Sequence, residues 1–556
     1  MLGKKKSEFS GEEVIAEFDR LTLDAAAVQR ETLRRILDEN AAVEYLQRLG
    51  LAGRTDPDAF RACVPLATHG DLEPYIGRVA DGDTSPVLTA KPITSISLSS
   101  DTTQGMRKYL PFNDELFKLT MHVYRTSFAF RNRAFPVDGD KALQFVYGSR
   151  PFTTKGGLTA TTATTNLYRN EEYKAAVCDI QLPCCSPDEV IFGPDFAESL
   201  YCHLLCGLLF AGEVRTVFAM FGHNLALAFE TLERVWEERV SALLAPDPAL
   251  ADEVTRRCAG LSNWYGVIPA LWPNARYVHT IVTGSMEHYV RKLRHYAGGL
   301  PLVAMDYGAS EGMVGANVEP EMPPESATFT VLPNIAYFEF IPLKTSHCGE
   351  ACPAASYAVA EPVSLTEVTI GEHYEVVMTT FAGLYRYRLG DVVKVAGFHN
   401  CTPKLKFVCR GMLTLSINVQ LAVDRAAKIL AAAERLEVLD YTSHADVMSD
   451  PGHYVIFWEL SAAEAGDDVL QSCCDELDRG FVDAGYVSSR KTNAIGPLEL
   501  RVLQPGTFQK VMDHYLSLGA PVNQFKLPRC VARSNSSVLR ILSSSTVKVL
   551  FSTAYG

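Results

Sequence analysis

Hydroxyl side chains are concentrated in one short stretch, Ser99-Ser100-Asp101-Thr102-Thr103-Gln104-Gly105, which follows apolar residues near Ile93 to Leu98. A loop of this composition offers hydroxyl and backbone N–H donors to phosphate oxygens, and Arg107 and Lys108 directly after it can balance negative charge. Ser/Thr/Gly-rich loops are also common as plain turns. The stretch by itself therefore leaves two interpretations open, a phosphate-binding loop and an ordinary turn.

A second segment combines an aromatic ring, a tight glycine turn and a carboxylate: Asp306-Tyr307-Gly308-Ala309-Ser310-Glu311-Gly312. The ring could stack on a nucleotide base, and the glutamate could hold Mg²⁺ through an oxygen ligand. An ordinary strand and turn explain the same residues, so the segment alone does not decide between the two.

A third segment, Tyr385-Arg386-Tyr387-Arg388-Leu389-Gly390-Asp391, places an aspartate directly after a glycine. Such an aspartate is well placed to accept hydrogen bonds from two ribose hydroxyls. The alternative is an alternating strand whose arginines point outward to solvent.

These residues need a scaffold, and the pattern of apolar residues indicates one of mixed α/β type (α+β). Helical spacing dominates the first fifty residues, with Ser10 and Glu13 as a capping box for the first helix. Residues 328–342 and 368–395 are rich in β-branched and aromatic residues and predict a second sheet or barrel. Residues 402–411 are interpreted as a crossing between domains. Further expected elements are strands at 142–146, 216–221 and 453–460, and helices at 204–211, 421–434 and 467–484.

Length and charge exclude several classes of protein. A chain of 556 residues is too long for one core, so we expect at least two domains. The 52 basic and 65 acidic residues give a net charge of −13, so we expect no nucleic-acid partner and no membrane partner. No apolar run approaches ~18 residues, and the N-terminus does not read as a secretory signal. We therefore expect a cytoplasmic protein.

The 14 cysteines do not have the spacing of a disulfide framework. Cys202 and Cys206 lie one helical turn apart with His203 between them, which permits a zinc site. Thiols on a buried apolar helix are the favoured interpretation.

Taken together and in this order, the three segments resemble those of adenylate-forming enzymes, and the chain resembles the plant acyl-acid-amido synthetases (the Gretchen Hagen family). The resemblance runs over almost the whole chain. The ending Phe551 to Tyr555, the Thr-Thr-Gln-Gly stretch and Tyr-Gly-x-Ser-Glu-Gly are most similar to the jasmonoyl-amino-acid synthetase branch, and the auxin-conjugating branch is next. Other similar segments are 128–133, 163–166, 185–190, 261–266, 283–286, 450–454 and 483–486.

The resemblance implies a large N-terminal adenylate-forming domain at residues 1–406, with sheets and a β-barrel-like part, and a small mobile C-terminal α+β lid domain at 407–556. It also implies roles for individual residues. Glu311 would face Mg²⁺, and Arg107, Lys108 and Glu311 would serve the chemical step. The ATP-binding residues would be Ser99, Ser100, Thr102, Thr103, Tyr307, Gly308, Ser310, Glu311 and Asp391. The residues near the acyl acid and amino acid would be Thr161, Thr164, Thr165, Asn166, Tyr168, Arg169, Met305, Met313, Lys510 and His514.

The reaction implied by the resemblance uses ATP and Mg²⁺. A small carboxylic acid, with jasmonate favoured, is adenylated, and the acyl group is transferred to a free amino acid, with an isoleucine-like one favoured. We expect a monomer. The alternatives are an indole-3-acetic acid (auxin) amido synthetase, a catalytically weakened relative that binds nucleotide or acyl acid, and an acyl-CoA ligase. The last needs a basic docking surface for coenzyme A, which the sequence does not offer.

The chain departs from the family pattern at four places. Asp101 stands where the family usually has glycine, and the segment 236–251 is shorter than in relatives. Met305 and Met313 replace ring-bearing residues beside the second segment. Ser537 stands where the jasmonate branch has a lysine near the nucleotide.

Overall fold

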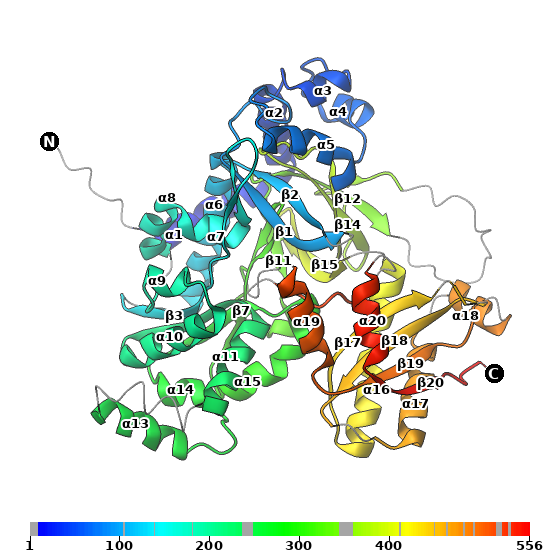
Figure 1. The fold of residues 1–556 in the computed structure, drawn as a ribbon. Helices are drawn as coiled ribbons and strands as arrows, with labels where there is room; N and C mark the ends of the chain where they lie inside the picture. Colours follow the sequence, from blue (N-terminus) through cyan, green and yellow to red (C-terminus); the bar gives the residue numbers. More distant parts are fainter. Residues whose placement is uncertain are drawn as a thin grey trace.

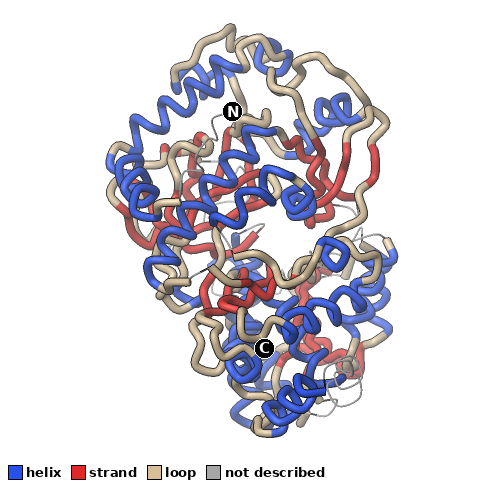
Figure 2. The backbone as a smooth tube through the Cα atoms, turned by 90° about the vertical axis from the view of Figure 1, so that its left-hand side faces the viewer, coloured by secondary structure: helices blue, strands red, loops and turns tan. Residues whose placement is uncertain are grey.

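The structure of the protein is a computed structural model. It describes residues 9–103, 106–137, 139–180, 182–235, 248–343, 360–410, 413–446, 448–449, 451–462, 465–481, 484–492, 495–518, 525–531 and 535–555. Figure 1 shows a large N-terminal part, coloured blue to green, beside a smaller C-terminal part, coloured yellow to red. In the view of Figure 2, most strands lie inside each part and most helices lie outside them.

The first residues form a helical layer, as the sequence predicts. α1 begins at Ser10, whose side chain accepts a hydrogen bond from the backbone N–H of Glu13 at 3.4 Å. Its buried face carries Ile15, Phe18 and Leu21, and this apolar stripe fixes the helix against the core. The helices of this layer are α1 (Gly11–Leu23), α2 (Ala25–Glu39), α3 (Glu44–Arg48), α4 (Pro57–Cys63) and α5 (His69–Ala80).

A parallel sheet in the order β3-β6-β7-β8 forms one layer of the N-terminal part. Its strands are β3 (Lys141–Phe145), β6 (Val214–Phe221), β7 (Tyr277–Ile281) and β8 (Leu302–Ala304). The strands expected at 142–146 and 216–221 are confirmed, and the buried helix expected at 204–211 overlaps α10, which ends at Leu209. The helices between or beside these strands are α6 (Asp114–Ala134), α7 (Ala163–Arg169), α8 (Glu171–Ile180), α9 (Asp188–Ile191), α10 (Phe196–Leu209), α11 (Gly222–Val235), α13 (Pro248–Ala259), α14 (Val267–Leu271) and α15 (Val290–Ala297).

The hydroxyl-rich stretch, over its described residues 99–103, is a strand and not the loop that we expected. It continues β1 (Ser95–Thr103), which pairs antiparallel with β2 (Met106–Phe112) and parallel with β5 (Thr159–Thr162). β4 (Phe152–Thr153) completes this sheet. The threonines are β-branched and suit an extended backbone, and pairing with β2 satisfies that backbone, which the local Ser/Thr/Gly composition does not reveal.

The second expected sheet is confirmed as an eight-stranded sheet in the order β13-β12-β14-β15-β16-β11-β10-β9. Residues 402–410, interpreted above as a crossing, form its strand β16, because they pair with β15 on one side and β11 on the other. The domain boundary expected at 406/407 lies within β16 and stays a prediction. The strands are β9 (Tyr307–Ala309), β10 (Gly312–Ala316), β11 (Phe329–Val331), β12 (Tyr337–Leu343), β13 (Val363–Ser364), β14 (His373–Thr379), β15 (Tyr387–His399) and β16 (Thr402–Arg410).

The C-terminal part has its own sheet, β17-β18-β19-β20, and its own apolar cores on both faces. The strand expected at 453–460 is confirmed, and the helix expected at 421–434 begins earlier, at Leu413. The helix expected at 467–484 is confirmed from Asp467, but α17 ends earlier than predicted, at Arg479, with Gly480 packed against Ala422, where a Cβ atom would lie 2.9 Å from the Ala422 backbone. The elements are α16 (Leu413–Glu434), β17 (Val438–Asp446), β18 (His453–Leu460), α17 (Asp467–Arg479), α18 (Ala484–Lys491), β19 (Glu499–Leu503), α19 (Thr507–Ser517), α20 (Ser536–Ser544) and β20 (Thr546–Phe551).

In Figure 1, α19 and α20 lie on the side of the C-terminal part that faces the N-terminal part. Two short 3₁₀ helices, Gly284–Tyr289 and Pro324–Ser326, complete the described elements. Within the described part of the chain, no helix is both long and apolar enough to cross a bilayer.

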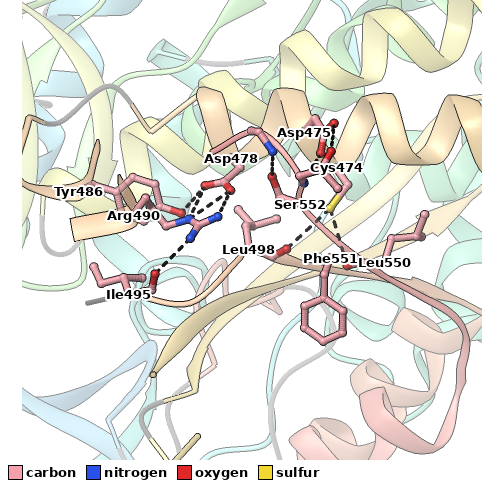
Figure 3. A network of polar contacts seen from close by, with 12 residues as sticks. Cys474, Asp475, Asp478, Tyr486, Arg490, Ile495, Leu498, Leu550, Phe551 and Ser552 are labelled. Atoms are coloured by element: carbon pink, nitrogen blue, oxygen red, sulfur yellow. Dashed lines mark hydrogen bonds and ion pairs between the residues drawn. The ribbon is translucent and has the colours of Figure 1, made fainter. Parts of the chain in front are cut away.

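A buried ion pair joins α17 to α18 in the C-terminal part (Figure 3). Arg490 donates to Asp478 Oδ2 at 2.9 Å, and the Tyr486 hydroxyl donates to Asp478 Oδ1 at 2.6 Å. Both charged side chains are almost fully buried, and Arg490 also donates to the carbonyl of Ile495. Because each buried charge is matched and hydrogen-bonded, removing either one leaves the other without compensation.

Asp478→Asn should therefore lower the free energy of unfolding of the C-terminal part by about 3–5 kcal/mol. The matched control is Asp467→Asn on the same helix, whose partner Lys548 is solvent-accessible, and that change should cost at most about 1 kcal/mol. Urea unfolding followed by fluorescence compares the three proteins. Equal midpoints for Asp478→Asn and the parent would contradict the importance of this pair.

Candidate active site

Two tyrosine–carboxylate hydrogen bonds connect the second and third segments. The Tyr307 hydroxyl donates to Asp391 Oδ2 at 2.9 Å, and the Tyr387 hydroxyl donates to Glu311 Oε1 at 3.2 Å. Each bond takes its hydroxyl from one segment and its carboxylate from the other, so we call them the crossed pairs. Both carboxylates are buried, with 4% of Asp391 and 1% of Glu311 exposed.

The crossed pairs join strands that are not neighbours. β16 and β11 stand between β15 and β10 in the sheet order. Neighbouring strands lie about 4.8 Å apart, so a flat sheet would hold β15 and β10 roughly 14 Å apart. We infer that the sheet curls here and brings the two segments together.

The backbone is irregular near both carboxylates. Glu375 on β14 pairs with Val392, but Val377 pairs with Arg388, so β15 carries extra residues between these points. Gly390 lies in this bulge with φ of +76°, a conformation that glycine adopts without steric cost. A register shift between Met313 and Gly315 similarly interrupts β10 after Glu311. Bulges of this kind redirect side chains, and the one on β15 includes Asp391.

Tyr307 is packed by other rings. Its ring lies 5.8 Å from that of Phe407 at 78° and 5.7 Å from that of Phe329. Only 6% of the residue is exposed. Next to it, Gly308 is exposed, and a Cβ atom there would lie 2.5 Å from the Met313 sulfur, so the methionine occupies the space that a side chain would need. Base stacking by Tyr307 stays a prediction.

The first segment lies on the β1–β2 hairpin. Ser99 is buried and Lys108 is half-buried. The side chains of Ser100, Thr102, Thr103 and Arg107, and that of Asp101, lie outside the described residues. Their expected contacts to phosphate therefore stay predictions.

Hydroxyl and amide side chains connect β1, β5 and α7. Asn166 donates to Ser97 Oγ at 3.2 Å, which ties α7 to β1. Ser149 Oγ lies 2.8 Å from Thr161 Oγ1 and 3.1 Å from Thr165 Oγ1. The predicted residues Thr161, Thr165 and Asn166 thus lie together. Ser149 was missed because it follows a strand in a segment without a recognisable motif.

The remaining predicted acyl-site residues border an apolar cluster. Tyr168 and Met305 belong to it, and the Tyr168 hydroxyl donates to Gln144 Oε1 at 3.1 Å. The Arg169 guanidinium lies over the ring of Phe192 at 4.3 Å. Thr164, Ser310 and Met313 are half-buried.

Lys510 and His514 lie on α19 in the C-terminal part, whereas Glu311 lies in the turn between β9 and β10 and Asp391 lies on β15. Lys510 is exposed, and His514 Nε2 lies 3.0 Å from Ser537 Oγ on α20. Ser537, expected above near the nucleotide, thus contacts His514, which is predicted to lie near the amino acid.

The histidine of the possible zinc site is structural. His203 Nδ1 lies 2.7 Å from Ser186 Oγ and its Nε2 lies 2.8 Å from the carbonyl of Val146, so both ring nitrogens have protein partners. Burial lowers the pKa of His203 to about 4, which keeps the ring neutral. In the described residues, no group of three or more His, Cys, Asp or Glu side chains is arranged to hold a metal ion.

A buried polar network underlies the second segment. Asp306 accepts hydrogen bonds from the Ser127 hydroxyl at 2.8 Å and from the backbone N–H of Asn317 at 3.0 Å. These contacts attach the strand end before Tyr307 to α6 and to the end of β10. Arg131 lies nearby, buried against His279.

Comparison with known proteins covers the whole chain. Residues 14–302 match the GH3 family N-terminal domain, residues 329–410 its central domain and residues 417–535 its C-terminal domain. The chain belongs to the GH3 family.

Relatives of this GH3 protein in rice (Oryza sativa subsp. japonica) match over nearly their full lengths. One is a jasmonoyl–L-amino acid synthetase, GH3.5, 58% identical, with 98% of this chain and 99% of the relative covered. Another is a probable indole-3-acetic acid-amido synthetase, GH3.12, 60% identical, with coverage of 100% and 99%. Among solved structures, the GH3.15 acyl acid amido synthetase superposes with a TM-score of 0.85 at 31% identity, covering 99% of each chain.

The buried carboxyl of Asp306 should give this GH3 protein a characteristic pH dependence. Burial raises the pKa of Asp306 to about 6, against ~3.9 in an unfolded chain, so the folded protein binds this proton more tightly. The stability contributed by the neutral carboxyl is complete below pH ~4 and is lost as the pH rises through about 6. About two pK units correspond to about 3 kcal/mol.

Asp306→Asn should remove this dependence, because the amide stays neutral and can keep the contacts with Ser127 and the Asn317 N–H. The measurement is the difference in unfolding free energy between pH 4.5 and pH 7 for both proteins. The variant should lose less stability over this range than the parent. The same loss in both would show that Asp306 does not titrate as stated.

Proposed function

We propose that this GH3 protein is an ATP-dependent acyl-acid amido synthetase, which adenylates a small carboxylic acid and joins the acyl group to an amino acid. The observation that carries the proposal is the pair of crossed hydrogen bonds. They link two of the three expected nucleotide-binding segments, those of Glu311 and Asp391, and both of these carboxyl groups are buried. The near full-length similarity to jasmonoyl- and indole-3-acetic acid-amido synthetases supports it.

The donor chemistry suits Mg²⁺ held with a nucleotide. Mg²⁺ is commonly bound by one or two carboxylates together with substrate phosphates, not by an all-protein cage. The buried Glu311 carboxylate supplies such a ligand, while the described residues hold no larger acidic cluster. When bound, Mg²⁺ would neutralise charge on the phosphates. Asp391 is assigned to the ribose hydroxyls, and Ser99, Ser100, Thr102 and Thr103 to the phosphates.

The chain's own residues then have a defined task in each step. In the first step the acid carboxylate attacks the α-phosphorus of ATP and pyrophosphate leaves, which requires mainly positioning and charge stabilisation. Lys108 and Arg107 supply positive charge beside the phosphates. In the second step the amino group attacks the acyl carbon and AMP leaves. The C-terminal part, which carries Lys510 and His514 on α19, is assigned the role of a lid that keeps water from the acyl adenylate.

We favour jasmonate as the acid and an isoleucine-like amino acid, in line with the GH3.5 relative. The second candidate is indole-3-acetic acid, favoured by the 60% identity to GH3.12. A monomer acting in the cytoplasm completes the proposal.

The first test is exchange of labelled pyrophosphate into ATP. We expect exchange that requires both Mg²⁺ and an acid, with jasmonate the best of a panel that includes indole-acetate, phenyl-acetate and benzoate. Exchange best with indole-acetate would shift the proposal to the auxin acid. Folded protein that gives no exchange with any of these acids would contradict the proposed activity and favour a binding role.

Asp391→Ala should weaken ATP binding about tenfold to hundredfold, since a hydrogen bond to a charged group contributes ~1.5–3 kcal/mol. Calorimetric titration with ATP measures the change. Tyr307→Phe is the matched control, because it removes the hydroxyl group that donates to Asp391 but keeps the Asp391 carboxylate. If both variants lost the same affinity, Asp391 would act by holding Tyr307 and not by binding ribose.

A further inference from the structure

Arg386, in the third segment, is buried and not directed outward as the alternating-strand interpretation had it. Its guanidinium donates to both oxygens of Glu339, at 2.9 and 3.0 Å. It also donates to the carbonyl of Val64 at 2.8 Å and to that of Arg61 at 3.2 Å, just beyond and within α4. Only 6% of Arg386 is exposed. One side chain therefore connects the N-terminal helical layer, β12 and the start of β15.

The backbone of Arg386 is unusual. Its φ is +44°, in the left-handed region that non-glycine residues seldom adopt. Such strain persists only where surrounding contacts impose it, and it is concentrated at functional positions. Here the imposing contacts are the Glu339 ion pair and a hydrogen bond from the Arg386 N–H to Thr379 Oγ1 at 2.9 Å.

Backbone hydrogen bonds with Ala67 fix the chain on both sides of Tyr387. The N–H of Ala67 donates to the carbonyl of Arg386 at 3.0 Å, and the N–H of Arg388 donates to the carbonyl of Ala67 at 2.8 Å. Ala67 thus pairs with Tyr387 like a short parallel strand. The orientation of Tyr387 is set by this pairing before its hydroxyl reaches Glu311.

We infer that Tyr387 is a positioning residue for Glu311. The Arg386–Glu339 ion pair, together with the hydrogen bonds from Arg386 to the α4 segment, holds Tyr387 in place. The sequence motifs gave no role to Tyr387 or to Arg386. The Tyr387 hydroxyl fixes one oxygen of the Glu311 carboxylate, so the carboxylate is oriented before any metal–nucleotide complex binds. The link to catalysis rests on the proposed function of Glu311.

Three variants test this inference. Tyr387→Phe removes one oxygen atom from the hydrogen bond to Glu311. Arg386→Lys keeps the charge but cannot make the two-point contact with Glu339. Arg388→Lys is the matched control, because the Arg388 side chain makes the same kind of two-point contact with Glu375 on β14 but, in the contacts of the described residues, donates to neither the Tyr387 side chain nor Glu311.

The first readout is amide hydrogen exchange of residues 307–316 in the ligand-free protein. Exchange should become about tenfold faster in Tyr387→Phe and Arg386→Lys, and should not change in Arg388→Lys. If Arg386→Lys does not fold, Tyr387→Phe alone decides. Unchanged exchange in that variant overturns the inference whether or not the protein has the proposed activity.

The second readout separates positioning from a general structural effect. In pyrophosphate exchange, the Mg²⁺ concentration for half-maximal rate should rise about tenfold in Tyr387→Phe, with the rate largely restored at saturating Mg²⁺ and the KM for the acid unchanged. Faster amide exchange with an unchanged Mg²⁺ requirement would overturn the role toward Glu311. Absence of exchange activity in the parent would count against the proposed function only, since the first readout still decides the positioning.

Discussion

Two buried carboxyl groups have to be hydrogen-bonded and oriented in this protein, and the crossed pairs meet that constraint. A carboxylate taken out of water without hydrogen bonds is costly, so each acidic side chain needs a donor at the site itself. The tyrosine hydroxyls supply these donors across the curled sheet. Because each donor belongs to the other segment, neither carboxylate can be oriented unless β9, β10 and β15 come together. The geometry of the site therefore depends on the curvature of the sheet.

The irregular backbone around the site follows from the same requirement. Regular strands would alternate side chains and point Asp391 and its neighbours to fixed faces. The bulge at Gly390 and the left-handed Arg386 interrupt that alternation on β15. Arg386 is held by Glu339 on β12 of the same sheet and by the carbonyl of Val64, directly after α4. The N-terminal helical layer thus supports the site although it carries none of the predicted nucleotide ligands.

The C-terminal part is organised differently. It has its own sheet, two apolar cores and a buried Asp478–Arg490 pair (Figure 3), so its internal order does not depend on the N-terminal part. That independence suits the lid role proposed for it, since a body that moves during a reaction must keep its own shape. The contact between His514 and Ser537 lies on the helices that face the N-terminal part in Figure 1.

The sequence by itself determined the family, the mixed α/β class and most regular elements, because apolar periodicity and capping are local properties that neighbouring residues specify. It also predicted Glu311 and Asp391 as site residues, which stays a prediction. Tertiary structure decided the rest. Thr102 and Thr103 of the hydroxyl-rich stretch became part of a strand because β2 pairs with them, and Arg386 turned inward because Glu339, 47 residues away, offers a buried partner. Tyr387 acquired its role only through contact with Glu311, 76 residues away in sequence. No local pattern encodes such contacts, because they exist only after the sheet has curled and closed the distance.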